Sequence, residues 1–345
     1  MAMSDEMQPF LGFWGGLKKP FFVLAPLANV TDFAFRQFVV SYKKPDVLWT
    51  EFVAADGLCH PKGQEALLRD LRFAQNERPI VAQLFTSYPE KMFEAAKLVK
   101  ELGFDGLDIN MGCPDKNVMK QGAGAACMKN PELAQQIIRA AMEGVRADGK
   151  GPIPVSVKTR LGFNKDEMEE WLPKVLETKP AALTLHLRTK KEMSLVPAHW
   201  DRMARAVELR DAISPETRML GNGDVKSMPE ARKKCAETGC DGVMFGRAIF
   251  GNPWLFDETK TEVMVNERLE ATIQLTELFE STWKGSKNFE ILKKHFQAYI
   301  VGFPKAKELR VALMETHTAQ EVKAIIEKFS NENPDLLMQS IELRV

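Results

Sequence analysis

Eight short apolar runs, each followed by a polar or small residue, recur along the first two thirds of the chain. They occupy residues 21–25, 47–50, 80–82, 106–109, 153–157, 182–185, 218–221 and 242–245. Short, almost continuously apolar runs are typical of parallel strands that are buried on both faces. The sequence therefore predicts a parallel sheet covered by helices.

Helix start signals lie between these runs. Asn130 precedes Pro131, and Ser87 stands three residues before Glu90, as in a capping box. Eight strand–helix units over about 235 residues fit a (β/α)8 barrel, for which about 250 residues are typical. An open doubly wound sheet is the rival, but residues 26–29 lack the glycine-rich turn expected after its first strand. We therefore predict an α/β protein with a (β/α)8 TIM barrel.

The pattern changes after the eighth run. From Met264 on there are no strand signals, and residues 269–283, 289–301, 305–315 and 318–329 each have a helical pattern. We expect an N-terminal extension at 1–20, a catalytic barrel at 21–257 and a helical domain at 264–345. The helical domain carries basic residues at Lys284, Lys287, Lys293, Lys294, His295, Lys305, Lys307 and Arg310. They are either ordinary solvated helix faces or a phosphate-contacting surface.

Composition narrows the possible classes of protein. With 47 basic and 47 acidic side chains, the chain is not a highly basic nucleic-acid binder as a whole. No apolar run approaches the ~20 residues of a membrane span, and the first 20 residues lack the order of a signal peptide. Five scattered cysteines do not form a disulfide framework or a metal-ligand spacing. We expect a monomeric cytoplasmic protein without metal or membrane attachment.

Polar side chains stand at the ends of six of the eight runs. They are Glu51, Gln83, Asn110, Lys158, His186 and Asn222. Barrel enzymes place their sites at the C-terminal ends of the strands, so these side chains are expected to meet at one mouth. A polar ligand is the simplest reason for such a set.

Two glycine-containing segments follow the seventh and eighth runs. They are Gly221-Asn222-Gly223-Asp224 and Phe245-Gly246-Arg247. Glycine lets a phosphate approach the backbone, and the loops after strands seven and eight are the usual phosphate site of this fold. The sequence therefore predicts a phosphate seat there, to which Arg247 adds a positive charge.

Lys158 and Cys113 have the most specific chemistry. A cation at Lys158 is suited to stabilise an anionic reduced flavin ring, although an ordinary salt bridge is the alternative. Arg160 would point to the same side as Lys158 if the strand continues, towards a base edge or a phosphate. Cys113 lies in an Asn-Met-Gly-Cys-Pro loop, and a thiol protonated near neutrality can donate a proton. The alternative is a small buried hydrophobic residue.

Taken together, these segments resemble the tRNA-dihydrouridine synthases, which are FMN-dependent. The resemblance spans roughly residues 23–256 and rests on several ordered motifs. They are Ala25-Pro26-Leu27-Ala28-Asn29-Val30-Thr31-Asp32, Asp108-Ile109-Asn110-Met111-Gly112-Cys113-Pro114, Gln121-Gly122-Ala123-Gly124-Ala125, Val157-Lys158-Thr159-Arg160-Leu161-Gly162, His186-Leu187-Arg188-Thr189, Gly221-Asn222-Gly223-Asp224 and Gly246-Arg247 with Asn252-Pro253-Trp254.

The resemblance implies a reaction and a set of roles. Cys113 would protonate C5 of a uracil in tRNA while the reduced flavin delivers hydride to C6, after NADPH has reduced the flavin. Asn110 and Arg160 would place the uracil, and the helical tail would bind tRNA. The residues implied to bind FMN are Ala25, Pro26, Leu27, Gln83, Lys158, His186, Asn222, Gly223, Asp224, Gly246 and Arg247.

Two other functions remain open at this point. An FMN barrel oxidoreductase could act on a free pyrimidine-type small molecule, but such an enzyme has no need of a basic helical tail. An RNA-binding protein with dispensable catalysis is the other alternative, and the presence of Cys113 and Lys158 argues against it.

Overall fold

The chain folds around eight parallel strands, as described by a computed structural model for residues 8–341. The strands are β1 Phe21–Leu24, β2 Leu48–Ala54, β3 Ile80–Phe85, β4 Gly106–Asn110, β5 Val155–Arg160, β6 Ala182–His186, β7 Arg218–Asn222 and β8 Gly242–Phe245. From β2 to β8 each strand pairs with the next along the chain, and β8 pairs with β1. A parallel bridge between Val23 and Val47 links β1 to β2 and closes the ring. The predicted (β/α)8 barrel is confirmed.

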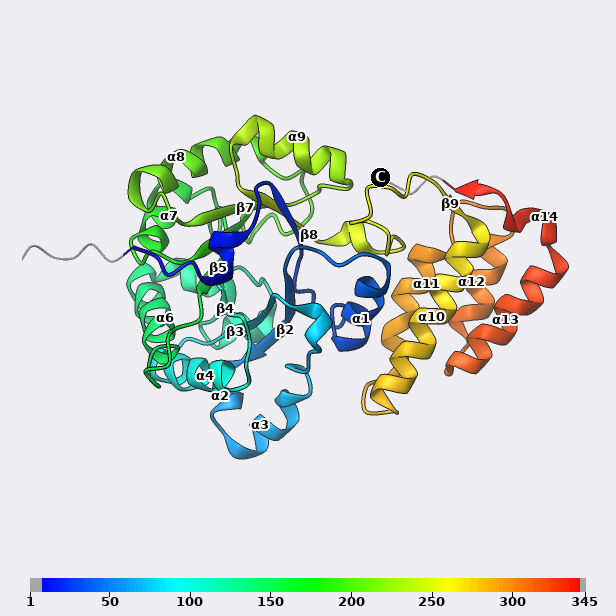
Figure 1. Ribbon diagram of the computed structural model, residues 1–345, viewed down its shortest axis with the longest axis horizontal. Coiled ribbons are helices and arrows are strands. Elements are labelled where there is room, and N and C mark those ends of the chain that lie inside the picture. The colour runs from blue at the N-terminus through cyan, green and yellow to red at the C-terminus, as the bar shows by residue number, and fades with distance from the viewer. Residues whose placement is uncertain (1–7, 342–345) are drawn as a thin grey trace, which may run out of the picture. The chain divides into compact units, whose positions relative to one another are not determined.

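Helices follow the strands and cover the outside of the sheet (Figure 1). They are α2 Ala55–Leu58, α3 Pro61–Leu68, α4 Pro89–Glu101, α5 Lys116–Lys120, α6 Pro131–Gly144, α7 Met168–Leu176, α8 Met203–Ile213 and α9 Met228–Thr238. The cap predicted for α6 is confirmed, because the Asn130 side chain accepts a hydrogen bond from the Leu133 amide. The capping box predicted at Ser87 is wrong. Tyr88 is the N-cap of α4, and the Ser87 hydroxyl donates instead to the Gln121 carbonyl at 2.5 Å.

Three strands run three or more residues further than the apolar pattern predicts. β2 continues to Ala54, β3 continues to Phe85, and β5 continues through Lys158 to Arg160. Arg160 is still in register with His186 on β6. The apolar pattern ends early because the barrel interior becomes polar near the C-terminal ends of the strands. Lys158 and Arg160 therefore share one side of a continuous strand, as the two-residue period requires.

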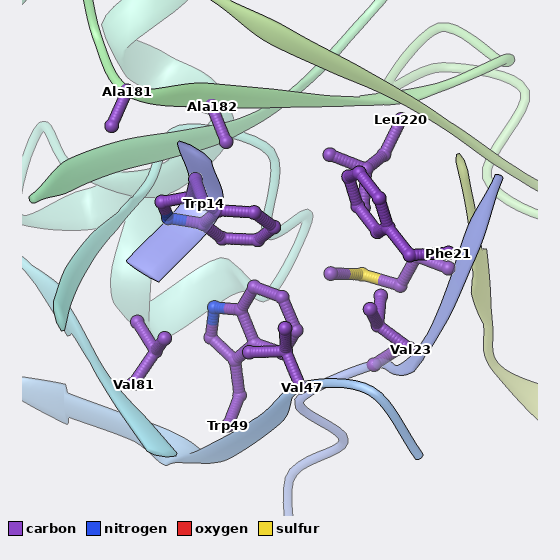
Figure 2. Packing of buried hydrophobic residues seen from close by; sticks show 11 residues of the cluster. Trp14, Phe21, Val23, Val47, Trp49, Val81, Ala181, Ala182 and Leu220 are labelled. Carbon is purple, nitrogen blue, oxygen red and sulfur yellow. The ribbon is translucent and has the colours of Figure 1, made fainter. Parts of the chain in front are cut away.

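The other end of the barrel interior is apolar and is filled from outside the strands. Trp14, on the short 3-10 helix Gly12–Gly16, is only 1% exposed. Its ring centroid lies 5.9 Å from that of Trp49 and 5.7 Å from that of Phe21. Figure 2 shows Trp14 facing Trp49, with Val81 and Leu220 from other strands beside them. The N-terminal segment thus contributes a core residue to the barrel.

The described residues form two compact units. The first comprises the chain through Ala28, Asp46–Val225 and Pro229–Gly246, and the second comprises Asn29–Pro45, Lys226–Met228 and the chain from Arg247 onwards. The second unit contains α1 Phe33–Tyr42, α10 Val265–Trp283, α11 Lys293–Tyr299, α12 Ala306–Met314, α13 Ala319–Glu332 and α14 Pro334–Leu337. The predicted C-terminal run of helices is confirmed, while the domain boundaries stay a prediction.

The expectation that no strand follows Met264 is wrong. β9 Val263–Met264 pairs antiparallel with β10 Ser340–Ile341. Both strands are only two residues long, so neither has enough residues to produce an alternating pattern in the sequence. Within the second unit, α1 packs against α10, and the Trp283 indole N–H donates to Asp32 at the start of α1.

Candidate active site

Four of the six polar side chains predicted to share a mouth lie at or near the C-terminal ends of the neighbouring strands β4 to β7. Asn110 is in register with Lys158, and His186 is in register with Asn222. The Lys158 ammonium donates to the Asn222 side-chain oxygen at 3.3 Å, and Asn222 in turn donates to the Met244 carbonyl at 2.7 Å. The structure therefore brings the strand ends together as the fold class required.

The loop that carries Cys113 is held by hydrogen bonds on three sides. The Asn110 side-chain oxygen accepts from the amides of Gly112 and Cys113, at 3.1 and 2.9 Å. Arg160 Nε donates to the Gly112 carbonyl at 2.7 Å, and the Ala125 amide donates to the Cys113 carbonyl at 2.9 Å. The thiol is half-buried, and part of its side chain packs against Phe85 and its neighbours.

The segment Gln121–Ala125 packs closely against the Cys113 loop at Gly124. Gly124 has a φ of +61°, and a Cβ placed on it would lie 2.9 Å from the Cys113 carbonyl oxygen and 2.8 Å from a Val118 methyl. Both the backbone conformation and the contact distance favour glycine at this position. The Gln121–Ala125 segment thus sets the position of the thiol loop.

Electrostatics keep the thiol protonated. Burial raises the pKa of Cys113 above its ordinary value, and the nearby charges of Lys158 and Arg160 oppose that shift only in part. Burial, with a further contribution from Arg160, lowers the pKa of Lys158 to about 8. At neutral pH the site therefore holds a neutral thiol and a charged ammonium, which interact with each other electrostatically. Such a pair can deliver a proton and stabilise negative charge.

Arg160 is more constrained than the sequence suggested. It is 7% exposed, and besides the Gly112 carbonyl it binds the carbonyls of Thr189 and Met193 through Nη1. Arg160 thus ties the Cys113 loop to the loop after β6. Burial lowers its pKa to about 10, so it stays charged at neutral pH.

Gln83 lies below the surface of the mouth. Its side chain is 0% exposed, and its amide donates to Asp108 at 2.6 Å and accepts from Asn110 at 2.9 Å. Asp108 is a site residue that sequence reasoning missed. The signal was available, since Asp108 stands two residues before Asn110 on one strand and so shares its side.

The predicted phosphate seat has two parts. Gly223 and Asp224 have φ angles of +132° and +57°, and the Trp200 indole N–H donates to the Gly223 carbonyl at 2.8 Å. Gly246 faces open space, because a Cβ placed on it would meet no heavy atom within 4 Å. Arg247 follows at the start of the short 3-10 helix Arg247–Ile249 and is exposed, but it belongs to the second compact unit.

Arg188 is a second residue that sequence reasoning left without a role. Its guanidinium is almost fully buried, pairs with Asp224 and lies 3.3 Å from His186 Nε2. Because a guanidinium only donates, the His186 nitrogen facing it must accept, which leaves the other ring nitrogen as the donor. Arg188 thus links the sixth and seventh strand ends.

The segment after β1 is ordered by backbone pairing. The Ala25 amide donates to the Phe245 carbonyl at 2.8 Å. Ala25 and Pro26 are buried, and Leu27 is half-buried. These three residues therefore form a small apolar strip at the end of β1.

Comparison with known proteins decides the family. The model of the family "Dihydrouridine synthase (Dus)" matches residues 23–333. The chain belongs to the dihydrouridine synthase family. Its members are flavin-dependent oxidoreductases, so the family predicted from the sequence motifs is confirmed.

Curated relatives agree along most of the chain. A "Probable tRNA-dihydrouridine synthase" of Staphylococcus aureus (strain MRSA252) is 39% identical over 319 residues, covering 92% of this chain and 95% of the relative. A "Probable tRNA-dihydrouridine synthase 2" of Bacillus subtilis (strain 168) is 39% identical over 325 residues, covering 94% and 98%. Among solved structures, a 2-naphthoyl-CoA reductase complex matches with a TM-score of 0.51 at 10% identity, covering 70% of this chain and 51% of that chain. This last likeness supports the fold alone.

The basic residues of the second unit are less available than their number suggests. His295 is 3% exposed, and its ring centroid lies 5.1 Å from that of Phe35 and 5.2 Å from that of Phe250. Lys287 pairs with Asp32, and Lys293 pairs with Glu290. The exposed basic positions of the predicted surface are Lys284, Lys305 and Lys307.

Between residues 8 and 341, no helix has the length and apolar character that crossing a membrane requires. Over the same residues, no three His, Cys, Asp or Glu side chains cluster in a way that could hold a metal ion.

Proposed function

We propose that this family member reduces the C5–C6 double bond of a uridine in tRNA to 5,6-dihydrouridine, with FMN as cofactor and NADPH as reductant, in the cytoplasm. The family and the names of the relatives support a flavin-dependent tRNA enzyme. The observation that supports the mechanism is that Cys113 and Lys158 are both half-buried at one end of the barrel and interact electrostatically, while burial raises the pKa of the thiol.

The residues at the mouth fit FMN. Open space next to Gly246 and the positive-φ backbone at Gly223 and Asp224 suit the phosphate end. His186 and Asn222, which are in register at the ends of β6 and β7, would supply hydrogen-bonding groups to the cofactor. The apolar strip of Ala25, Pro26 and Leu27 suits the face of a flat ring. Lys158 supplies a cation. Gln83, which is buried, would act indirectly through its hydrogen bonds to Asn110 and Asp108.

When bound and reduced, the flavin would supply a hydride to C6 of the uracil. Cys113 then donates its proton to C5, so that hydride and proton together saturate the double bond. The thiolate that remains is stabilised by Lys158 and Arg160, because both charges lower the pKa of Cys113. Asn110 and Arg160 would place the uracil, the latter through Nη2, since its Nε and Nη1 already bind backbone carbonyls.

The uracil must reach this mouth from within a folded RNA. A base stacked inside tRNA has to be extruded before a reagent in a protein pocket can reach it, and phosphate contacts stabilise the extruded arrangement. We assign such contacts to the helical C-terminal region, where Lys284, Lys305 and Lys307 are exposed.

The test uses purified protein with FMN, NADPH and tRNA that lacks dihydrouridine, and mass spectrometry of the RNA. Cys113→Ala is expected to keep the flavin and its reduction by NADPH but to lose most dihydrouridine formation. Cys59→Ala, which removes the other half-buried thiol, is the matched control and should remain active. Full turnover by Cys113→Ala removes Cys113 from the acid role.

The same assay separates the alternatives. Reduction of free uracil or uridine at a rate equal to that of tRNA would favour a small-molecule oxidoreductase. A protein that binds tRNA but takes up no FMN would favour an RNA-binding role without catalysis.

A further inference from the structure

A chain of buried hydrogen bonds runs from the barrel interior to the backbone of Cys113. Ser156 on β5 donates to Asp108 Oδ1 at 2.5 Å, and Gln83 on β3 donates to Asp108 Oδ2 at 2.6 Å. Asn110 on β4 donates to the Gln83 oxygen at 2.9 Å and accepts from the Cys113 amide at 2.9 Å. Ser156, Asp108 and Gln83 are at most 2% exposed, so solvent does not replace these contacts.

The direction of this chain is set at one end. A carboxylate only accepts hydrogen bonds, so Gln83 must turn its NH2 group to Asp108 and its oxygen to Asn110. Asn110 must then turn its NH2 group to Gln83 and its oxygen to the amides of Gly112 and Cys113. If Gln83 were reversed, its oxygen would face the carboxylate and its NH2 group would face another NH2 group. Burial raises the pKa of Asp108 to about 6, so the side chain is still a carboxylate at neutral pH.

We propose that Asp108 is a positioning residue, whose carboxylate fixes the orientation of the Gln83 and Asn110 amides and thereby the loop that presents the Cys113 thiol. Asp108 does not touch the reacting atoms in this account. It acts through two amides on neighbouring strands, and its effect ends at the backbone N–H of Cys113. The importance of this for catalysis rests on the proposed function, in which Cys113 is the acid.

The measurement is the rate at which iodoacetamide alkylates Cys113, followed by peptide mass spectrometry on the purified full-length protein with matched flavin content. Asp108→Leu removes the acceptor, so the Asn110 cap on the loop is lost and the half-buried thiol becomes more accessible. Loss of one such hydrogen bond corresponds to about a tenfold faster reaction. Asp108→Asn keeps one acceptor for Gln83 and can donate to the Ser156 hydroxyl, so Cys113 should react as in the wild type.

Controls are built into the same molecule. Ser156→Ala removes a donor on the far side of Asp108 and leaves the chain to Cys113 complete, so its thiol should react normally. Cys59, which is also half-buried, reports general changes in reactivity, and the buried Cys127 reports unfolding. Gln83→Leu should match Asp108→Leu, and the double variant should be no faster than either, because a chain broken at one link is already broken.

Several outcomes would overturn the proposal. One is an Asp108→Leu protein whose Cys113 reacts at the wild-type rate, and another is a Ser156→Ala effect of the same size. Reaction of the buried Cys127 would show that Asp108→Leu has unfolded. In that case the alkylation rates of Cys113 in Gln83→Leu and in Asp108→Asn are compared instead. Equal rates in these two variants refute the positioning role of Asp108. Alkylation measures the accessibility of the Cys113 thiol and needs no turnover. Absence of dihydrouridine formation would therefore refute the proposed function without affecting the test of the Asp108 positioning role.

Discussion

Lys158→Met should raise the free energy of unfolding of the flavin-free protein at pH 7. The same substitution should abolish uridine reduction by the FMN-loaded protein. Burial lowers the pKa of Lys158 from 10.5 to about 8, which means that the folded state disfavours the charged ammonium. At about 1.36 kcal/mol per pKa unit, the shift corresponds to a cost of about 3 kcal/mol at pH 7. Methionine has a similar length and no charge, so it avoids this cost. It also loses the 3.3 Å hydrogen bond to Asn222, worth about 1 kcal/mol, which leaves a net gain of about 2 kcal/mol.

The dependence on pH separates this cause from a packing effect. The folded pKa is lowered, so between pH 8 and 10.5 the folded state binds fewer protons than the unfolded chain. Wild-type stability therefore rises with pH in this window, by about 1.36 kcal/mol per unit from this group. The advantage of Lys158→Met should be constant below pH 8 and should fall by about 2 kcal/mol by pH 9.5.

The assay is urea unfolding of the flavin-free proteins at pH 7, 8.5 and 9.5, with Lys191→Met as the matched control. Lys191 is exposed on the loop after β6, so its replacement should change stability by less than about 0.5 kcal/mol at any of these pH values. The reasoning is refuted if Lys158→Met is less stable than the wild type at pH 7, or if its advantage is unchanged at pH 9.5. A stabilising substitution that removes activity is the behaviour expected of a residue held for function.

Three further predictions concern the core, the thiol loop and the second unit. Trp14→Ala should lower the free energy of unfolding by about 3–5 kcal/mol, measured by urea unfolding, because Trp14 fills the barrel interior; Phe10→Ala, at a site 41% exposed, should cost much less. Gly124→Ala should cost about 1–3 kcal/mol and reduce uridine reduction while leaving FMN affinity intact, since the new Cβ would displace the Cys113 loop. Unchanged uridine reduction by Gly124→Ala would show that the position of the Cys113 loop does not affect the reaction. Lys307→Glu, on α12, should weaken tRNA binding and reduce its salt dependence in a filter-binding assay. The control Lys328→Glu, on α13, is expected to have a smaller effect. Equal effects of the two substitutions would argue against a specific basic surface.

The barrel could be predicted because each strand carries its own apolar signal. The polar ends of the strands were the part that this signal missed. Lys158 and Arg160 continue β5 because the ladder to His186 holds them, although neither is apolar. The place of Trp14 had no local signal at all. Its partners Trp49 and Phe21 lie on different strands, so only the closed barrel brings them together.

The site could be predicted at the level of residue types and strand ends, and less well at the level of contacts. The sequence marked Gln83 and Asn110 as strand-end amides, but it gave no sign that they bind each other. That contact depends on the register of β3 against β4, which places Gln83 opposite Asp108. Arg160 was recognised as a cation at the mouth, yet three carbonyls from two loops fix most of its donors. Loop conformations of this kind are determined by tertiary structure rather than by local pattern.

Burial shifts the pKa values of Cys113 and Lys158 in opposite directions. This difference explains how one end of the barrel can hold both a proton donor and a positive charge. It raises the pKa of Cys113 and lowers that of Lys158 to about 8, because in each case the uncharged form is favoured. A thiol that is harder to ionise remains a proton donor at neutral pH, while the ammonium keeps its charge there with little margin. Deeper burial would discharge Lys158, and fuller exposure would let Cys113 ionise more easily. The half-buried position of both side chains at the end of the barrel is therefore the condition under which a protonated thiol and a charged ammonium coexist, and in our proposal the Asp108–Gln83–Asn110 chain holds the thiol loop in that position.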